Sequence, residues 1–223
     1  AIERDGQPAL LLDVPPAAMR AMGPRVGHWM PVGNEGSGRV VAAGGHPDAQ
    51  ALIGQRVGMF GGEMYAGYRC VPIDQCMPFS DAISAEQAAS CFVNPMTALG
   101  FMETRDMEGQ KAIVHTAAAS NLGQMLNRLC QADDVPLVNI VRSEEQVALL
   151  KSQGAEWVLN SSDEDFMSQL IEALVATRAT LAFDAIGGGK GVNRILTAME
   201  LAAAKTGPWS RYGSEEPKQA YIY

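Results

Sequence analysis

The sequence lacks the features that mark a membrane-spanning, secreted or nucleic-acid-binding protein. No stretch approaches the roughly 18 consecutive apolar residues that a membrane-spanning helix requires. The 17 lysines and arginines form no basic block and are outnumbered by 25 aspartates and glutamates, so we expect no nucleic-acid partner. The first residues lack the basic and then apolar order of a signal peptide, and we therefore expect a soluble, cytoplasmic protein.

Cysteine is also scarce, and its spacing does not match that of metal sites. The sequence contains no C-x-x-C pair and no nearby pair of histidines at metal-ligand spacing. We therefore predict no bound metal and four free, buried thiols. These are Cys70, Cys76, Cys91 and Cys130.

The composition favours a globular protein, and its first half has a β-type pattern. Hydrophobic residues make up 47% of the 223 residues, enough to bury the core of one large domain or two modest ones. Residues 32–77 are rich in glycine and in short β-type runs, which predict a compact β-rich unit. The runs lie at 38–45, 55–60 and 68–72. From Ser84 the pattern becomes helical, with helices predicted over 85–89 and 94–102.

Beyond residue 110, apolar strands alternate with helices. The predicted strands are 112–115, 137–141, 157–159, 180–183 and 220–223, and the predicted helices are 122–130, 144–152, 163–176 and 190–204. Ser162 is expected to cap the third of these helices. Because each parallel crossover needs a dozen or more residues, the alternation predicts an α/β fold with a doubly wound parallel sheet. The last strand reaches the final residue, so we expect this sheet to be truncated there.

The turn after the first of these strands could bind a pyrophosphate. It places Ala118, Ser120 and Gly123 where a G-x-G-x-x-G turn has its glycines. Small side chains let backbone N–H groups approach a pyrophosphate, provided that alanine and serine need not adopt a positive φ. An ordinary strand-to-helix turn explains the segment equally well.

A cation follows the second strand, where an NAD-specific site usually has an acidic residue. Arg142 lies about twenty residues beyond Gly123. A guanidinium can form a two-pronged pair with a 2′-phosphate, so Arg142 favours NADPH over NADH, with NADH still possible. The alternative is a solvated arginine at a strand end, partly neutralised by Glu144 or Glu145.

Five segments occur in an order that is typical of one enzyme superfamily. They are GNEGSGRVV at 33–41, GQRV at 54–57, VNPMTA at 93–98, AAASNLG at 117–123 and FDAIGG at 183–188. In this order they resemble the medium-chain dehydrogenase/reductase superfamily, specifically its zinc-free branch of quinone oxidoreductases and 2-enoyl thioester reductases. Zinc-dependent members carry a histidine where this sequence has Asn34, so the resemblance implies a zinc-free enzyme.

The resemblance also implies a domain organisation and a set of cofactor-binding residues. Residues 1–92 would form a partial β-rich GroES-like substrate domain, and residues 93–223 a Rossmann dinucleotide-binding domain. The implied sites are Asn94 and Thr97 near the nicotinamide, Ser120, Asn121 and Leu122 at the pyrophosphate, Arg142 and Ser143 at the adenosine phosphate, and Ile186, Gly187 and Tyr223 at the nicotinamide end. A structural alternative for Asn94 is an N-cap followed by Pro95 at the first helical position.

These observations predict an NAD(P)H-dependent oxidoreductase that transfers hydride to a quinone, enone or enoyl-type acceptor, and we expect it to form a homodimer. No catalytic residue is assigned, because His115 on the first strand is expected to be a packed or hydrogen-bonded core residue. Four methionines flank the expected cleft and favour a small apolar substrate: Met59, Met64, Met96 and Met102. The alternatives are a catalytically idle NADPH-binding protein, acting as a sensor or structural component, and an α/β module that has lost its nucleotide.

Overall fold

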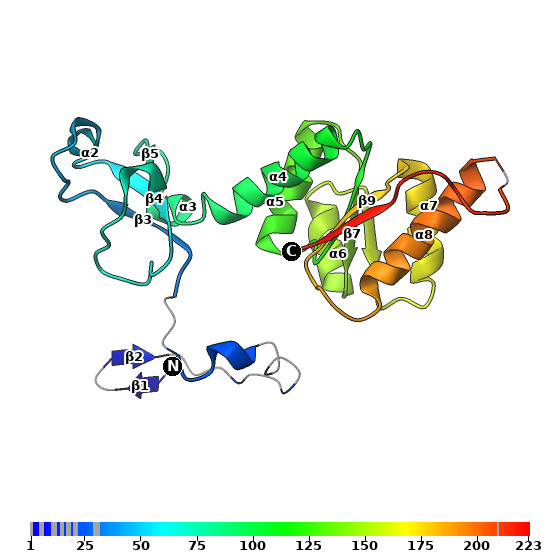
Figure 1. Cartoon of the computed structure of the whole chain (residues 1–223), viewed down its shortest axis with the longest axis horizontal. Coiled ribbons are helices and arrows are strands. Elements are labelled where there is room, and N and C mark those ends of the chain that lie inside the picture. The colour runs from blue at the N-terminus through cyan, green and yellow to red at the C-terminus, as the bar shows by residue number, and fades with distance from the viewer. Residues whose placement is uncertain are drawn as a thin grey trace.

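The computed structural model describes residues 32–208 and 210–223 throughout, together with 2–4, 7–9, 13, 16, 19 and 22–28. Its strands form three sheets (Figure 1). An antiparallel pair contains β1 (Ile2–Arg4) and β2 (Gln7–Ala9), and an antiparallel sheet contains β3 (Glu35–Arg39), β4 (Arg56–Phe60) and β5 (Cys76–Phe79). A parallel sheet contains β6 (Ile113–Thr116), β7 (Leu137–Val141), β8 (Trp157–Asn160), β9 (Leu181–Asp184) and β10 (Gln219–Ile222).

The parallel sheet has the strand order β10-β9-β6-β7-β8. The chain therefore moves outward from β6 in one direction through β7 and β8, and then returns to the other side of β6 for β9 and β10. This is the order of a dinucleotide-binding sheet, and it confirms the predicted doubly wound α/β fold. Every residue of β6, β7 and β9 is buried, as expected for parallel strands that are covered on both faces.

Helices cover both faces of this sheet. The longer ones are α4 (Val93–Met107), α5 (Asn121–Ala132), α6 (Glu144–Ser152), α7 (Phe166–Thr177) and α8 (Gly191–Thr206). On one face, α7 and α8 pack against Val114 and Ala182. On the other face, α4 and α5 pack against Ile113 and Phe183, while α6 contributes Leu150 to a smaller cluster. Alternate residues of each strand thus supply the two cores.

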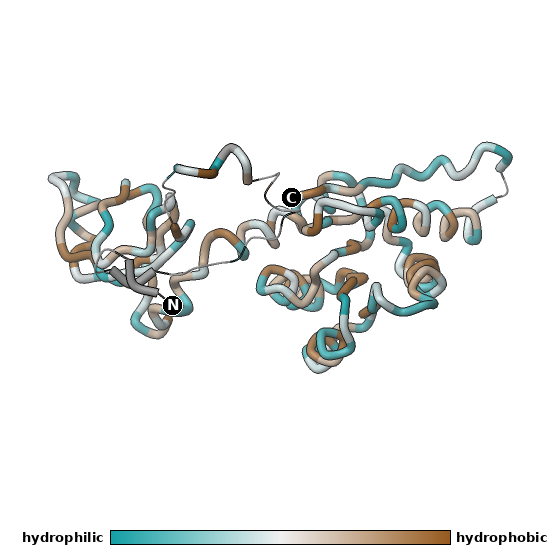
Figure 2. The backbone as a smooth tube through the Cα atoms, turned by 90° about the horizontal axis from the view of Figure 1, so that it is seen from below, coloured by the Kyte–Doolittle hydropathy of each residue, from teal (hydrophilic) through white to brown (hydrophobic). Residues whose placement is uncertain are grey.

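The three-stranded sheet forms a separate unit that precedes α4. It carries α2 (Pro47–Ala51), α3 (Ala85–Ala88) and the 3₁₀ turn η2 (Ile73–Gln75), and a further 3₁₀ turn, η1 (Gly23–Arg25), lies earlier in the chain. Both views of the chain separate this unit from the parallel sheet, with the helical segment of α3 and α4 between them (Figures 1 and 2). Ser84 caps α3 through a capping box with Gln87, which confirms the helix start predicted at Ser84.

Four local predictions were wrong. The β-type run at 38–45 continues a strand only as far as Arg39. No strand forms over 68–72, where the ring of Tyr68 is exposed. Helix α7 begins at Phe166 with Asp165 at the N-cap position, and the hydroxyl of Ser162 donates to the carbonyl of Arg142 instead of capping that helix. The N-cap of α4 is Phe92, so Asn94 and Pro95 lie inside its first turn. In the last two cases a contact with a distant segment sets the local structure. The carbonyl of Arg142 binds the Ser162 hydroxyl, and the carboxylate of Glu35 binds the first N–H groups of α4.

Gly123 allows α5 to pack closely against the turn that follows β6. A Cβ atom at this position would lie 2.2 Å from the carbonyl oxygen of Ala118, and that oxygen belongs to the backbone and cannot rotate away. The turn itself holds Ala117 at φ 49°, a left-handed conformation that alanine rarely adopts. Ala118 and Ser120, which replace glycines of the motif, do not adopt a positive φ, so the condition set for them holds, and the strain lies one residue earlier, at Ala117.

Replacement of Gly123 by alanine is expected to destabilise the protein by at least about 2 kcal/mol, because the new methyl group overpacks the contact between helix and turn. Gly100→Ala is the matched control, since a Cβ at Gly100 in α4 meets nothing within 4 Å. There the better helix propensity of alanine should stabilise the chain by about 0.5–1 kcal/mol. Urea unfolding of both variants tests the contact, and equal effects at the two glycines would contradict it.

Candidate functional site

The carboxyl ends of β6 and β9 lie side by side at the point where the sheet reverses its strand order. In open α/β sheets, ligands bind in the crevice outside the carboxyl ends at such a point. Two turns border it here, the segment 117–120 after β6 and the segment 185–187 after β9. Five of the ten predicted cofactor-binding residues belong to these turns or to the first residues of α5: Ser120, Asn121, Leu122, Ile186 and Gly187.

The start of α5 offers backbone donors to an anion. Ser120 is the N-cap, and its hydroxyl accepts from the N–H of Gly123 at 3.2 Å. No hydrogen bond in the described part of the chain engages the N–H groups of Asn121 and Leu122. Because the first N–H groups of a helix are free and carry partial positive charge, this end can bind phosphate oxygens. Ser120 therefore shapes the turn, while Asn121 and Leu122 supply the donors.

Asp184 ties the two turns together. Its carboxylate, which is 1% exposed, accepts from the hydroxyl of Thr116 at 2.6 Å and from the N–H of Gly187 at 3.0 Å. The N–H of Ile186 also donates to it, and the hydroxyl of Thr116 in turn accepts from the N–H of Ala185. A buried carboxylate is tolerated only when hydrogen bonds replace its hydration, so these contacts fix the 185–187 turn.

Sequence reasoning singled out Ile186 and Gly187 and missed the residue that positions them. The available signal was an acidic residue at the end of an otherwise apolar strand, since Asp184 follows the three apolar residues of β9. A carboxyl group at that position is buried unless the chain turns away from the sheet. It must therefore find donors in the following turn or on the neighbouring strand.

His115 and Tyr223 form a hydrogen-bonded pair at this edge. Nε2 of His115 and the hydroxyl of Tyr223 lie 2.7 Å apart, and the N–H of Tyr223 donates to the carbonyl of Asp184. Burial lowers the pKa of His115 to about 4, against an opposing effect of Asp184, so the imidazole is neutral near pH 7. The expectation of a packed, hydrogen-bonded histidine agrees with this geometry, which includes a partner just after β10 that the sequence did not reveal.

The start of α4 carries Asn94 and Thr97. Thr97 donates to the carbonyl of Val93 at 2.7 Å, and Asn94 is partly buried without a side-chain hydrogen bond in the described part of the chain. Both lie on the helical stripe of Phe101, whose ring contacts Tyr223 with 4.9 Å between centroids. The helix is capped from the other unit, because a carboxylate oxygen of Glu35 accepts from the N–H groups of Phe92 and Val93 at 2.8 and 2.9 Å.

Arg142 and Ser143 lie at the end of β7. The Arg142 side chain is exposed, and no ion pair in the described part of the chain includes it. Glu144, a possible neutralising group, instead accepts a hydrogen bond from Asn160 at 2.8 Å. Ser143 caps α6 by accepting from the N–H of Gln146. The guanidinium is therefore available to an anion at the outer end of the crevice.

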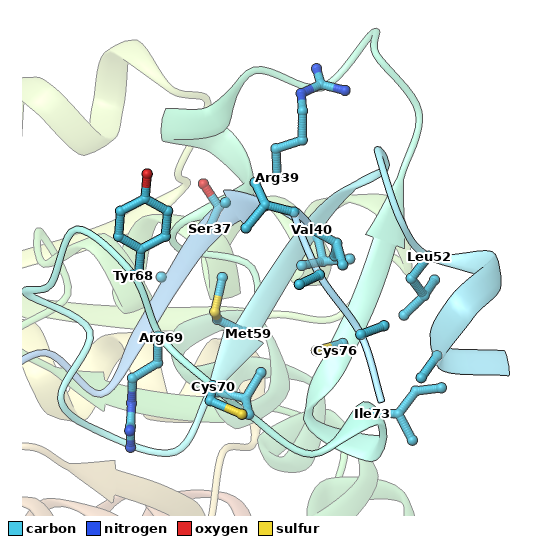
Figure 3. A pocket seen from close by; sticks show the side chains of 18 of the residues that line it. Ser37, Arg39, Val40, Leu52, Met59, Tyr68, Arg69, Cys70, Ile73 and Cys76 are labelled. Carbon is cyan, nitrogen blue, oxygen red and sulfur yellow. The ribbon is translucent and has the colours of Figure 1, made fainter. Parts of the chain in front are cut away.

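A separate cavity of about 490 Å³ lies in the three-stranded unit (Figure 3). Val57 and Met59 line it, whereas Gly58 between them faces Ala88 of α3, so the cavity opens on the face of β4 turned away from α3. None of the ten predicted cofactor residues lines it. Met64 also lines the cavity, but Met102 is buried against Cys130 in the core and Met96 is exposed, so the four methionines do not form one substrate pocket.

The four cysteines differ in exposure. Cys130 is buried, Cys76 and Cys91 are partly buried, and Cys70 is exposed, so the prediction of four buried thiols was wrong. Within the described ranges, no cluster of three or more histidine, cysteine, aspartate or glutamate side chains could hold a metal ion. No helix among these residues has the length and apolar character needed to span a membrane.

The chain is similar to several oxidoreductases, although no family model matches it. It is 25% identical to a quinone oxidoreductase of Pseudomonas aeruginosa over 159 residues, which cover 70% of this chain and 49% of that protein. It is 28% identical to a mitochondrial enoyl acyl-carrier-protein reductase of Caenorhabditis elegans over 191 residues, 82% of this chain and 53% of that protein. The chain thus spans about half the length of the curated relatives it matches.

The chain is also similar to a solved structure of an oxidoreductase. A candidate NADPH:quinone reductase from Mesorhizobium loti superposes with a TM-score of 0.69 and is 36% identical, over 76% of this chain and 50% of that one. Sequence and structural similarity thus point to the same group of oxidoreductases. They confirm the resemblance drawn from the five sequence segments.

The buried imidazole predicts how stability depends on pH. The pKa of His115 is lowered by burial to about 4 in the folded chain, so the unfolded chain, with a histidine pKa of about 6.5, binds more protons between these values. The free energy of unfolding should therefore fall as the pH drops from about 6.5 to 4, with His115 contributing up to about 3 kcal/mol.

Urea unfolding at pH 7.0, 5.5 and 4.5 measures this contribution. His115→Gln, which cannot be protonated, should lose less stability on acidification than the wild type. His28→Gln, at an exposed turn, is the matched control and should behave as the wild type. A His115→Gln variant that loses as much stability as the wild type would show that the imidazole is not held neutral.

Proposed function

We propose that this chain, a member of the medium-chain dehydrogenase/reductase superfamily, carries the cofactor-binding part of an NADPH-dependent oxidoreductase that reduces quinones, enones or enoyl-type acceptors without zinc. The cofactor supplies a hydride when bound, and the protein binds and orients it. A cytoplasmic homodimer is the form that we expect.

One observation carries this proposal: the free N–H groups of α5 and the turn fixed by Asp184 border the same crevice at the carboxyl ends of β6 and β9. A dinucleotide needs an anion site for its pyrophosphate and a well-ordered wall at its nicotinamide end. Asn121 and Leu122 provide donors for the first, and Ile186 and Gly187 provide the second. The absence of a Cβ at Gly123, which lets α5 approach the turn, supports the same interpretation.

The preference for NADPH rests on Arg142. An exposed guanidinium that pairs with no carboxylate in the described part of the chain can form two parallel hydrogen bonds with a 2′-phosphate. The diol of NADH offers no charge to this group. The carboxylate of Glu144 is engaged with Asn160, which removes one competitor for Arg142.

The acceptor class is inferred from the relatives. Those described above are named for the reduction of quinones and of enoyl thioesters, both of which are conjugated carbonyl compounds. The zinc-free mechanism rests on Asn34, since an amide side chain is a poor ligand for zinc compared with histidine or cysteine. The backbone carbonyl of Asn34 accepts from the N–H groups of Gly61 and Gly62, which gives this residue a structural role in the turn.

Arg142→Ala should raise the Kd for NADPH at least tenfold and leave the Kd for NADH nearly unchanged, because a charge-assisted bidentate pair contributes about 1.5–3 kcal/mol. Titration of cofactor fluorescence in the full chain measures both constants. Arg128→Ala is the matched control, because Arg128 is an exposed arginine of α5 outside the proposed site.

If Arg142→Ala weakened the binding of NADPH and of NADH equally, Arg142 would not be the residue that binds the 2′-phosphate. Binding of neither cofactor to the wild-type chain would contradict the proposed function itself. Tight binding of NADPH with no reduction of any quinone, enone or enoyl acceptor would instead favour the idle cofactor-binding alternative.

A further inference from the structure

We propose that Tyr223 donates the proton that completes the reduction and that His115 is its positioning residue, because the Tyr223 hydroxyl lies 2.7 Å from a buried imidazole at the carboxyl edge of the sheet. The inference rests on the proposed function, since it names the proton donor for the same reaction. It concerns two residues that sequence reasoning treated as a core histidine and a cofactor contact.

The position of Tyr223 suits a proton donor. Its N–H donates to the carbonyl of Asp184 at 3.2 Å, so it lies beside the 185–187 turn at the proposed nicotinamide end of the crevice. His115, its partner, is completely buried, so the imidazole is held inside the protein while the hydroxyl of Tyr223 meets it from the end of the sheet. The phenol therefore lies between the buried imidazole and the turn at which the nicotinamide is proposed to bind.

Aromatic packing restricts the orientation of this phenol. The ring of Phe101 meets the edge of Tyr223 with 4.9 Å between centroids and an interplanar angle of 68°. Phe101 is in turn stacked on Phe183, with 3.9 Å between centroids. Edge-to-face and stacked pairs of this kind favour one ring arrangement, so the hydroxyl is held towards His115.

The surroundings of His115 indicate which of its nitrogens carries the proton. Nδ1 is buried and has no partner in the described part of the chain. A buried N–H without an acceptor is rarer in proteins than an under-satisfied acceptor, which favours a bare Nδ1 and a protonated Nε2. In that tautomer Nε2–H donates to the phenolic oxygen, so the hydrogen of the Tyr223 hydroxyl is free to point into the crevice.

The charges around the pair keep both groups in the required protonation state. Burial lowers the pKa of His115 to about 4, and desolvation together with the charge of Asp184 raises the pKa of Tyr223 to about 12. Asp184 is the charged group that acts on both, and the packed rings of Phe101 and Phe183 are neutral. Near pH 7 the imidazole is therefore neutral and the phenol is protonated.

The proton transfer balances with hydride addition to a conjugated carbonyl. With NADPH bound, hydride addition at the β-carbon of the acceptor would move the electron pair of the C=C bond through the conjugated system to the carbonyl oxygen. The O–H bond of Tyr223 then breaks and its proton goes to that oxygen. The phenolate left behind keeps its hydrogen bond from Nε2–H of His115 and regains a proton from water.

Tyr223→Phe tests the donor role in the full chain. We expect kcat for an enone or quinone to fall by about 10²–10⁴-fold, the usual contribution of a general acid, while the Kd for NADPH changes less than about twofold. Tyr212→Phe is the control, because this ring is exposed in a separate loop, and it should leave both values unchanged. A higher Kd with an unchanged kcat would reduce Tyr223 to a cofactor contact and overturn the proposal.

The positioning role of His115 has its own readouts. Nitrogen-15 NMR of the wild-type histidines should show the Nε2–H tautomer for His115, and an Nδ1–H tautomer would overturn the proposal because the phenol would then donate to the imidazole. In kinetics, His115→Gln should retain most of kcat, since its amide nitrogen can reach the position of Nε2. His115→Asn is too short and should lose kcat by at least tenfold, and equal activity of the two variants would contradict positioning.

The proposed function and this inference fail in different ways. If the wild-type chain binds no NADPH and reduces no acceptor, the proposed function is wrong, and the inference fails with it. If the wild type binds NADPH and is active, and Tyr223→Phe is equally active, only the inference is wrong.

Discussion

The carboxylate of Asp184, buried at the end of β9, accepts hydrogen bonds from a neighbouring strand and from the turn that follows its own strand. Removal of a carboxylate from water costs several kcal/mol, so the group is stable there only while Thr116 and the N–H groups of Ile186 and Gly187 remain in place. The position of the turn is thus coupled to the pairing of β6 with β9. Because Tyr223 donates to the carbonyl of Asp184, the last described residue is held by the same group.

The two ends of the crevice differ in electrostatic character. The outer end offers the exposed cation of Arg142, and the start of α5 adds the partial positive charge of free N–H groups. At the inner end, His115 and Tyr223 are both uncharged near pH 7 and pack against aromatic rings. Phosphates suit the first environment and an apolar conjugated acceptor suits the second, so the arrangement fits a cofactor that extends across both.

The sequence predicted the parallel sheet well because apolar runs and helix signals are local patterns. Helix α6 begins and ends at the residues expected, and the four helices and five strands of the sheet follow the expected order. The missed features depend on contacts between distant segments: Glu35 caps α4 from β3, and Tyr223 reaches His115 across the sheet. The burial of Met102 and the exposure of Cys70 likewise depend on packing that no local pattern encodes.

Amide chemical shifts measured during a titration of the chain with NADPH show whether the cofactor binds at the carboxyl ends of β6, β7 and β9. We expect the largest changes on residues 118–123, on Arg142 and Ser143, and on 185–187, with smaller changes elsewhere. Changes centred on the cavity between β4 and the loop that carries Tyr68, or on the amino edge of the sheet near Asn127 and Trp157, would contradict this expectation.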